Sequence, residues 1–410
     1  MNALPPENRA FMTERRVGLI GAFMVAVGPV SMALYTPAMP EIVDAFGTTE
    51  SAVKLTLSLY FAGFAFSQLI CGPMSDGFGR KPIIIAFMTL YLAASVVALF
   101  APSVEVLIVA RFFQGAGAAV GVAISRALIR DLFHNDRAAR IMNLQAIILA
   151  VGPALSPTLG GIIMELAGWH AIFLVMVAMG AGVIVTTHLG LRETVPRDLS
   201  RIRPRALIQS YSALLGSSYF MLSSLVVAGT VGALYTLATV LPFILIDRVG
   251  LTATEFGVGM LMQSGSFFVG SLIVRRLLRT IPAARLVPVG LAFVGAGALA
   301  IAVLLRIAPP SFLSVMGPIA SYAFGIAFIM PAMMVASVAP FPRIAGSASS
   351  MSGFMQMGGG LLGGTVAALI GDPVVATATI IPAMGFIAIA AWIGWSLLPE
   401  PPGVTRIGSG

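Results

Sequence analysis

Charged residues are scarce in this chain. Only 10% of its 410 residues are Asp, Glu, Lys or Arg, whereas 58% are hydrophobic. A soluble domain carries about 25% charged residues because polar groups must cover its surface. The composition therefore excludes a soluble enzyme, a soluble nucleic-acid-binding domain and a disordered chain. It predicts a protein embedded in a lipid bilayer.

Several chemical signatures are also missing. The hydrophobic runs are long and continuous, so the alternating strands of a membrane β-barrel are not expected. The single cysteine, Cys71, cannot form an internal disulfide. The sequence has no phosphate-binding G-x-x-x-x-G-K-[ST] loop, no metal-ligand cluster and no paired acids deep in an apolar run. We therefore expect no catalytic residue, no metal, no cofactor and no ATP-driven activity; the protein is not expected to be an enzyme.

Twelve apolar stretches are long enough to cross a bilayer, at about 20 residues each. Every span must satisfy its backbone hydrogen bonds internally, so each is read as a helix. The predicted spans are 17–40, 53–71, 83–101, 104–126, 141–164, 169–190, 215–243, 256–274, 285–306, 311–338, 345–370 and 374–398. The predicted fold class is an all-α integral membrane protein.

Basic residues are distributed unequally between the two sides of these spans. Twenty of the 24 Lys and Arg residues fall on the side of the N-terminus, and three, Lys54, Arg248 and Arg306, fall on the other side. Loops rich in Lys and Arg stay in the cytoplasm. We therefore expect both termini to be cytoplasmic. The net charge of +8 then reflects topology and anionic lipid headgroups, not a nucleic-acid partner.

The longest polar stretch, 191–212, holds five arginines and separates two sets of six spans. Glycine-rich segments at 152–161 and 358–364 occupy equivalent places in the two sets and indicate a duplication. We expect an N-terminal six-helix bundle at 1–190, a cytoplasmic Arg-rich linker at 191–212 and a C-terminal six-helix bundle at 213–410. Two such halves around a central site are typical of secondary transporters.

A charged loop joins the second and third spans. It reads GPMSDGFGRKP from Gly72 to Pro82. Glycine permits positive φ in a tight turn, and an acid at a helix end can face the positive N-terminus of a neighbouring helix. The pattern G-x-x-x-D-x-x-G-R-K resembles the signature loop of the major facilitator superfamily. Gly77 stands where that family usually has a basic residue.

Other segments carry the same resemblance. The fourth span contains RFFQGAG from Arg111, similar to the family's R-x-x-Q-G-x-G motif, and leads to Arg130 and Asp131. The fifth span carries Gly152, Pro153, Gly160 and Gly161, which resemble the antiporter motif of exporters; these residues are expected to bend the helix and allow close contact with the opposite half. With LYTPAMP from Leu34 and AGSAS from Ala345, the chain resembles the Bcr/CflA drug-resistance family of this superfamily.

The resemblance covers nearly the whole chain and implies a specific architecture. It implies the major facilitator fold, with twelve transmembrane helices in two pseudo-symmetric six-helix bundles, in a bacterial inner (plasma) membrane. It also implies multidrug efflux by alternating access with proton antiport. One position departs from the pattern: relatives usually have an aspartate where Ala33 stands, and none of the sixteen acidic residues falls near a predicted bilayer midplane. The carrier of a coupling proton is therefore not identified.

The charged loop is expected to act as a conformational gate. The resemblance implies that Asp76 meets the N-terminus of the eleventh span near Gly346 and Ser347, and that Arg80 pairs with Asp131. Contacts of this kind would hold the cytoplasmic side closed and break when it opens. The expected gate residues are Gly72, Asp76, Gly79, Arg80, Lys81, Arg130 and Asp131.

Arg111 is the one full charge placed well inside a span. Its burial costs about 2.5–3.5 kcal/mol on insertion scales, so it should face a wet cavity or a partner. Gln114 lies one turn away on the same face. Arg111 is interpreted either as a structural residue bonded to Gln114 and carbonyls, or as a cavity charge. The second reading predicts a neutral to positive cavity that favours neutral, zwitterionic or anionic solutes.

Single polar residues on other spans are further candidates for the substrate cavity or for coupling. A polar residue in a span also commonly bonds a neighbouring helix, and that alternative stays open for each. With Arg111 and Gln114, the candidates are Tyr35, Asn143, Tyr235, Gln263, Tyr322 and Gln356.

The sequence thus predicts a secondary active exporter of small amphipathic or drug-like molecules. The alternative within transport is an exporter or facilitator of an anionic, zwitterionic or neutral metabolite that is not strictly proton-coupled. A non-transporting membrane sensor is a third reading and would be expected to carry an added soluble domain. The expected partners are a small-molecule substrate, protons and the lipid bilayer, and the expected oligomeric state is a monomer.

Overall fold

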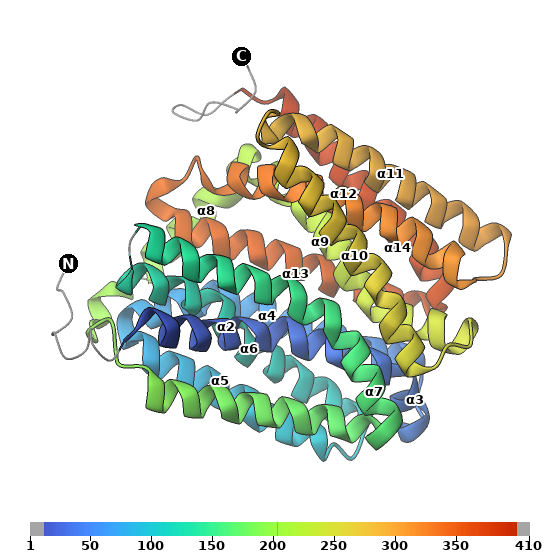
Figure 1. Cartoon of the computed structure of the whole chain (residues 1–410), viewed down its shortest axis with the longest axis horizontal. Helices are drawn as coiled ribbons and strands as arrows, with labels where there is room; N and C mark the ends of the chain where they lie inside the picture. The colour runs from blue at the N-terminus through green and yellow to red at the C-terminus, as the bar shows by residue number, and fades with distance from the viewer. Residues whose placement is uncertain (1–11, 134, 203, 400–410) are drawn as a thin grey trace.

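Helices make up all the regular secondary structure that the structure describes. A computed structural model of the chain describes residues 12–133, 135–202 and 204–399, and those ranges contain no strand. Long helices run side by side in an N-terminal group, blue to green, and a C-terminal group, yellow to red (Figure 1). This architecture confirms the predicted all-α membrane fold.

The N-terminal group begins with four spans. Its first elements are α2 (Glu14–Tyr35), η1 (Thr36–Ala38), α3 (Met39–Phe46), α4 (Glu50–Phe78), α5 (Arg80–Leu99) and α6 (Val104–Leu132). The side chains of Thr13 and Thr49 accept backbone hydrogen bonds at the starts of α2 and α4, which favours helix initiation there. Pro37 lies in the short 3₁₀ helix η1, which interrupts the predicted first span between α2 and α3.

The element α7 (Asn135–Gly190) contains two spans. It is 56 residues long, which at 1.5 Å per residue would be about 84 Å, far more than the roughly 30 Å of a bilayer core. Gly168 interrupts the helix with φ 72° and ψ 175°, a conformation that glycine adopts readily. The chain therefore turns at Gly168, as predicted for a fifth span at 141–164 and a sixth at 169–190.

The remaining spans follow a connecting segment. That segment contains η2 (Leu199–Arg201) and α8 (Pro204–Leu215). The C-terminal group consists of α9 (Ser218–Pro242), the π-helical η3 (Phe243–Arg248), α10 (Ala253–Leu277), α11 (Ala283–Ile307), α12 (Phe312–Val338), η4 (Pro342–Ile344), α13 (Ala345–Ile370) and α14 (Pro373–Leu397). Among the described residues, eleven helices are long and apolar enough to span a membrane. Because α7 contains two spans, these helices provide the twelve spans that the sequence predicts.

Each group has its own hydrophobic core. One cluster of buried side chains is built mainly from residues between Met12 and Leu191, and another from residues between Tyr219 and Trp395. Two cores agree with two six-helix bundles. The predicted boundaries at 190 and 213 stay a prediction.

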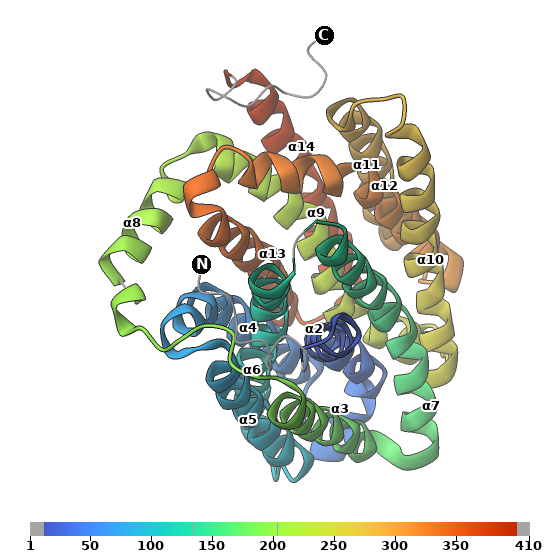
Figure 2. The same ribbon diagram turned by 60° about the vertical axis from the view of Figure 1, so that its left-hand side comes forward.

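The two groups meet along two pairs of helices. Helix α4 packs on α13, and α7 packs on α10. Gly364 and Gly360 of α13 face Ser58 and Phe61 of α4. Small residues at such crossings let helix backbones approach closely. Figure 2 shows α2, α4, α9 and α13 grouped where the two halves meet.

The two ends of the bundle differ in their charged groups. We call the end that carries the α4–α5 loop and the connecting segment the Arg80 end. The opposite end, which carries α3 and the start of α4, is the Lys54 end. In Figure 1 α8 lies at the left and α3 lies at the right.

Candidate functional site

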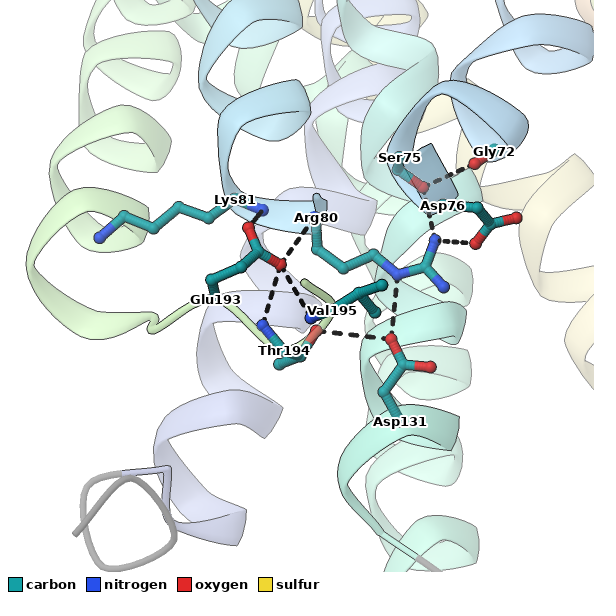
Figure 3. Close-up of polar contacts among 9 residues, drawn as sticks. All are labelled: Gly72, Ser75, Asp76, Arg80, Lys81, Asp131, Glu193, Thr194 and Val195. Atoms are coloured by element: carbon teal, nitrogen blue, oxygen red, sulfur yellow. Dashed lines mark hydrogen bonds and ion pairs between the residues drawn. The ribbon is translucent and has the colours of Figure 1, made fainter. Parts of the chain in front are cut away.

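Arg80 is the centre of a polar network at the Arg80 end (Figure 3). It is the first residue of α5, and only 7% of it is exposed. Its Nε donates to Asp131 Oδ2 at 2.9 Å, and its Nη1 contacts Asp76 Oδ1 at 2.6 Å and Ser75 Oγ at 2.6 Å. The predicted pairing of Arg80 with Asp131 is confirmed, so one guanidinium joins the ends of α4, α5 and α6.

The expected contact of Asp76 is different in the structure. Its carboxylate lies against Arg80, one turn along the chain, and its side chain is 51% exposed. Around Gly346, at the start of α13, an added Cβ would meet nothing within 4 Å. The expectation that Asp76 meets the N-terminus of α13 is therefore corrected. This contact depends on how far apart the halves stand at this end, which a sequence pattern does not specify.

Glu193 is a member of this network that the sequence analysis missed. It lies just after the sixth span, and its carboxylate accepts the backbone N–H groups of Arg80 at 2.9 Å and Lys81 at 3.1 Å. It also accepts from the N–H groups of Thr194 and Val195. A carboxylate at a helix N-terminus satisfies orphan donors and complements the helix dipole. Glu193 therefore caps α5 from the connecting segment.

Lys81, near the start of α5, bonds the end of α7 through its side chain, and here the side chain is the hydrogen-bond donor. Its Nζ donates to the carbonyls of His188 at 2.8 Å and Leu191 at 2.9 Å. These carbonyls lie at the C-terminal end of α7, where helices favour cations. Lys81 thus caps the sixth span while Glu193 caps the third.

Two glycines fit this loop for different reasons. Gly79 has φ 100°, and an added Cβ would lie 2.6 Å from Glu193 Oε2, so both its conformation and its neighbour favour glycine. Gly77 lies under the side chain of Ile202. Its carbonyl also accepts the backbone N–H of Asp198 at 2.9 Å.

Two further residues, Gly72 and Arg130, were expected to belong to the gate. Gly72 is partly buried and Arg130 is exposed.

The connecting segment is fastened to α4 at a second point. The hydroxyl of Tyr211 on α8 donates to the carbonyl of Leu69 at 2.7 Å. Burial raises the pKa of Tyr211 to about 12, so the hydroxyl remains a donor at neutral pH. A polar composition alone did not predict that this linker folds back onto the bundle.

Arg111 lies inside the N-terminal bundle. It is fully buried, and its guanidinium carbon is 4.3 Å from the ring centroids of both Tyr35 and Tyr60. Its Nη1 donates to Gln114 Oε1, and Gln114 Nε2 donates to Ser95 Oγ at 2.7 Å. The structure therefore brings Arg111, Gln114 and Tyr35 together. The contact with Gln114 agrees with the interpretation of Arg111 as a structural residue. The interpretation of Arg111 as a cavity charge stays a prediction.

A small cavity lies between the two halves. Its volume is about 20 Å³. It is lined by Gly28, Pro29, Met32, Tyr60, Phe61 and Phe64 of the first half and by Tyr235 and Met357 of the second. The rings of Phe61 and Tyr235 meet across it with centroids 5.4 Å apart. Tyr235 is the one member of the predicted cavity set among these lining residues; its neighbours are aromatic or apolar.

The other predicted polar residues are dispersed. Tyr322 is fully buried in the C-terminal core, and its hydroxyl donates to Gly229 O at 3.1 Å. This contact agrees with the alternative in which a polar residue of a span bonds a neighbouring helix. Gln356 donates to Ser352 O at 3.3 Å within α13. Gln263 is partly buried and Asn143 is exposed. The structure does not bring these four together with Arg111.

The glycines of the fifth span lie at helix crossings. An added Cβ at Gly160 would meet the backbone of Leu34 on α2, and one at Gly161 would meet the backbone of Ala253 at the start of α10. The expected close contact with the opposite half is confirmed at Gly161. Gly152 faces only the side chain of Val30, at 3.1 Å, and Pro153 lies within α7.

Lys54 is a second residue that the sequence analysis missed. It is fully buried at the start of α4, and its Nζ donates to Gly371 O in the other half at 2.5 Å and to Glu50 at 3.3 Å. Glu50 also pairs with Arg248 of the other half at 3.3 Å. The signal was available in the sequence, since Lys54 is one of three cations on the arginine-poor side.

Further polar contacts close the Lys54 end. Glu165 on α7 accepts the N–H of Thr254 on α10 at 2.9 Å, and Thr158 donates to Gly257 O at 2.9 Å. These contacts join the two halves beside the α7–α10 pair, and the contacts of Lys54 and Glu50 join them beside the α4–α13 pair. The structure is therefore a conformation in which the Lys54 end is shut.

Comparisons with known proteins agree on one family. A family model described as the Major Facilitator Superfamily matches residues 21–368. Multidrug resistance protein D of Escherichia coli (strain K12) is 28% identical over 382 residues, covering 92% of this chain and 94% of that protein. An uncharacterized MFS-type transporter, YdgK of Bacillus subtilis (strain 168), is 28% identical over 396 residues, covering 92% of each chain.

Two further matches extend this result. Multidrug resistance protein MdtL of Shigella flexneri serotype 5b (strain 8401) is 27% identical over 350 residues, covering 85% of this chain and 87% of that protein. Among solved structures, the crystal structure of a D-xylose-proton symporter matches with a TM-score of 0.74 and 14% identity, over 95% of this chain and 99% of that one. At that identity the structural match concerns the fold alone.

Proposed function

The chain belongs to the major facilitator superfamily, and we propose that it exports small, uncharged, amphipathic or drug-like molecules by alternating access. As a member of this family it is a multi-pass membrane transporter and not an enzyme. The names of the multidrug resistance relatives support drug efflux. The Bcr/CflA assignment rests on the motifs of spans 1, 4, 5 and 11 and is part of the proposal.

The lining of the central cavity carries the proposal. Phe61, Phe64, Tyr60 and Tyr235 present aromatic surface, and Met32 and Met357 present flexible thioethers. Binding sites for small molecules are mostly apolar with few polar groups, and methionine adapts to ligands of different shape. No carboxylate or cation is among these lining residues. Such a site favours a neutral, partly aromatic solute and provides no counter-charge for a lipophilic cation.

The cavity is too small to hold a drug in this conformation. A drug-sized site is about 300–1,000 Å³, against about 20 Å³ here. We propose that it widens when the halves separate at the Arg80 end, while the contacts of Lys54 and Glu165 hold the other end shut. In this proposal the Arg80 end, rich in arginine, faces the cytoplasm of a bacterium and receives the solute there.

The proposed gate is the Arg80 network. Arg80, Asp131 and Glu193 tie α5 and α6 to the connecting segment, and the segment crosses to the second half. A rearrangement of this network would accompany opening and closing. We propose that the proton gradient drives export, with Asp76 and Asp131 as candidate proton-exchanging groups. Both are acids that contact Arg80.

One observation favours a second candidate function. The positive charge of Arg111 lies against Tyr60, which also lines the cavity. A positive charge behind the cavity wall favours anions and zwitterions over cations. The alternative is therefore export or facilitated passage of an anionic, zwitterionic or neutral metabolite without strict proton coupling.

The proposal is tested by the accumulation of radiolabelled chloramphenicol in energised cells. Cells that express the protein are compared with cells that express the Phe61→Ala/Tyr235→Ala variant at equal membrane abundance. Lower accumulation with wild type, abolished by a protonophore, is the expected result. Equal accumulation in both, with or without the protonophore, would contradict drug export and favour the metabolite alternative.

A further inference from the structure

Two tyrosine rings lie against the Arg111 guanidinium. The ring centroids of Tyr35 and Tyr60 each lie 4.3 Å from its carbon atom, and the residue has no exposed surface. Two cation–π contacts stabilise the buried ion. They do not provide a hydrogen-bond acceptor. Only the edges of the guanidinium plane remain for hydrogen bonding.

One edge of the guanidinium makes a hydrogen bond, and the other has no partner among the residues that the structure describes. Nη1 donates to Gln114 Oε1 and lies 4.0 Å from Met176 Sδ. Gln114 is fixed in this orientation because its Nε2 donates to Ser95 Oγ at 2.7 Å. Nε and Nη2 are buried without a hydrogen-bond partner. These donors form one edge of the planar fork with which arginine binds anions.

The charge of Arg111 is also unbalanced. Arginine stays protonated in proteins. Among the residues that the structure describes, no Asp or Glu lies within ion-pair distance of it. A buried charge without a counter-charge costs several kcal/mol even after relaxation. Two aromatic rings and one amide oxygen reduce this cost but leave the net charge in place.

A further donor lies nearby. Ser31 Oγ and Tyr91 OH are 2.6 Å apart, and Tyr91 is close enough to Arg111 for the two to interact electrostatically. In a pair of hydroxyls one proton is shared and the other remains free to donate. The surroundings of Arg111 therefore include an O–H donor in addition to its own N–H groups and positive charge.

We infer that the Nε and Nη2 edge of Arg111 binds one small monovalent anion, such as chloride, within the N-terminal bundle. A water molecule could accept these hydrogen bonds but would leave the charge unbalanced. The anion both accepts the bonds and neutralises the guanidinium. This site is separate from the cavity between the halves, and its existence does not depend on which solute is transported.

The site is tested with purified full-length protein in detergent. Its melting temperature is followed as sodium gluconate is replaced by sodium chloride at constant ionic strength. A ligand that binds only the folded state raises stability as its concentration exceeds the dissociation constant. We expect a saturating rise in melting temperature with chloride and with bromide, but not with sulfate, which is divalent and larger. A rise with formate alone would support the anion site and assign it to a carboxylate ligand.

Two isosteric variants make the test specific. Gln114→Glu places a carboxylate on the contact that Gln114 already makes with Arg111, so it supplies the counter-charge within the protein. We expect this variant to lose the response to chloride. Gln145→Glu is the control, because Gln145 is also buried in this bundle but bonds Ser125; it should keep the response.

Two results would overturn the inference. One is a wild-type melting temperature that is the same in gluconate, chloride, bromide and formate. The other is a chloride response that is unchanged in Gln114→Glu, since this would indicate a general salt effect. Crystals soaked in bromide give an independent readout: an anomalous peak beside Arg111 Nε and Nη2 is expected in wild type and not in Gln114→Glu.

Discussion

Lys54 and Gly371 belong to opposite halves of the transporter and are joined by a 2.5 Å hydrogen bond from the buried ammonium to the carbonyl. The ammonium also lies 5.2 Å from the centre of the Phe243 ring and pairs with Glu50. This contact exists only while the halves are together at the Lys54 end. Lys54 is therefore in a position to influence the equilibrium between the conformation that is open at the Lys54 end and the conformation that is open at the Arg80 end.

The first prediction concerns that balance. Lys54→Met removes a hydrogen bond to a charged group, which contributes about 1.5–3 kcal/mol. We expect the equilibrium to shift about 10- to 100-fold toward opening at the Lys54 end. The measurement is the distance distribution between spin labels at Ala45 and Ala308, which are exposed at this end. The longer distance should become more populated.

A matched variant checks this interpretation. Arg248→Gln removes an ion pair to Glu50 across the same interface, but Arg248 is 45% exposed. Exposed pairs contribute about 0–1 kcal/mol, so its distance distribution should stay close to wild type. Equal shifts in both variants would mean that burial of Lys54 is unimportant.

The second prediction compares the two acids that hold Arg80. The side chain of Asp131 is 23% exposed and that of Asp76 is 51% exposed. The less exposed pair is less screened by water, so Asp131→Asn should lower the melting temperature more than Asp76→Asn. Both should lower the transport rate if the network is a gate. Full-rate transport by both variants would show that it is not.

The third prediction concerns the cap on α5. Glu193→Gln keeps the side-chain shape but removes the charge that faces four backbone N–H groups. Helix caps and charges at helix N-termini contribute about 0.5–2 kcal/mol. The melting temperature should fall, and hydrogen exchange should speed up in the first turn of α5. Glu193→Asp, which keeps the charge, serves as the control and should recover part of the loss.

The fourth prediction uses the contact of Gly77 with Ile202. Gly77→Ala would push the Ile202 side chain off the end of α4 and loosen the connecting segment. We expect faster proteolysis of the segment near Arg197. Combining Gly77→Ala with Ile202→Ala makes room for the new methyl group and should restore resistance. A double variant as sensitive as Gly77→Ala would argue against this packing.

The fifth prediction concerns the crossing of α7 and α10. Gly161→Ala places a methyl group against the backbone at Ala253 and Thr254, which cannot move without separating the helices. Transport should fall at least about tenfold, because a poorly packed closure costs on the order of 1–3 kcal/mol. Gly152→Ala meets only the movable side chain of Val30 and should stay within about twofold of wild type. Similar losses in both variants would contradict this account of the crossing.

Much of the fold could be predicted because the bilayer constrains composition. The spans predicted at 104–126, 311–338 and 345–370 begin within one residue of α6, α12 and α13. The Arg80–Asp131 pair followed from the motif. The roles of Glu193 and Lys54 could not be predicted, because each depends on a contact with a distant segment: the start of α5 for Glu193 and Gly371 for Lys54. Asp76 was misplaced because its partner depends on the conformational state.

Arg111 also shows that contacts between distant segments are hard to predict from the sequence. Its burial and its contact with Gln114 were readable from spacing along one helix. The contacts of Tyr35 and Tyr60 with its guanidinium need three helices to meet, so the sequence alone left its surroundings open between a structural partner and a wet cavity. Conversely, Tyr235 of the cavity lining was predicted, whereas the aromatic lining contributed by Phe61 and Phe64 was hidden among the many apolar residues of α4.

The central claim is that the site between the halves exports neutral amphipathic solutes, and transport by the purified protein tests it most directly. Protein in proteoliposomes, with the Arg80 end facing outward, is given an imposed proton gradient and either chloramphenicol or ethidium. The account predicts gradient-driven uptake of chloramphenicol, little uptake of ethidium, and loss of uptake in Phe61→Ala/Tyr235→Ala. Uptake of ethidium in preference to chloramphenicol, or uptake of chloramphenicol that the double variant leaves unchanged, would contradict it.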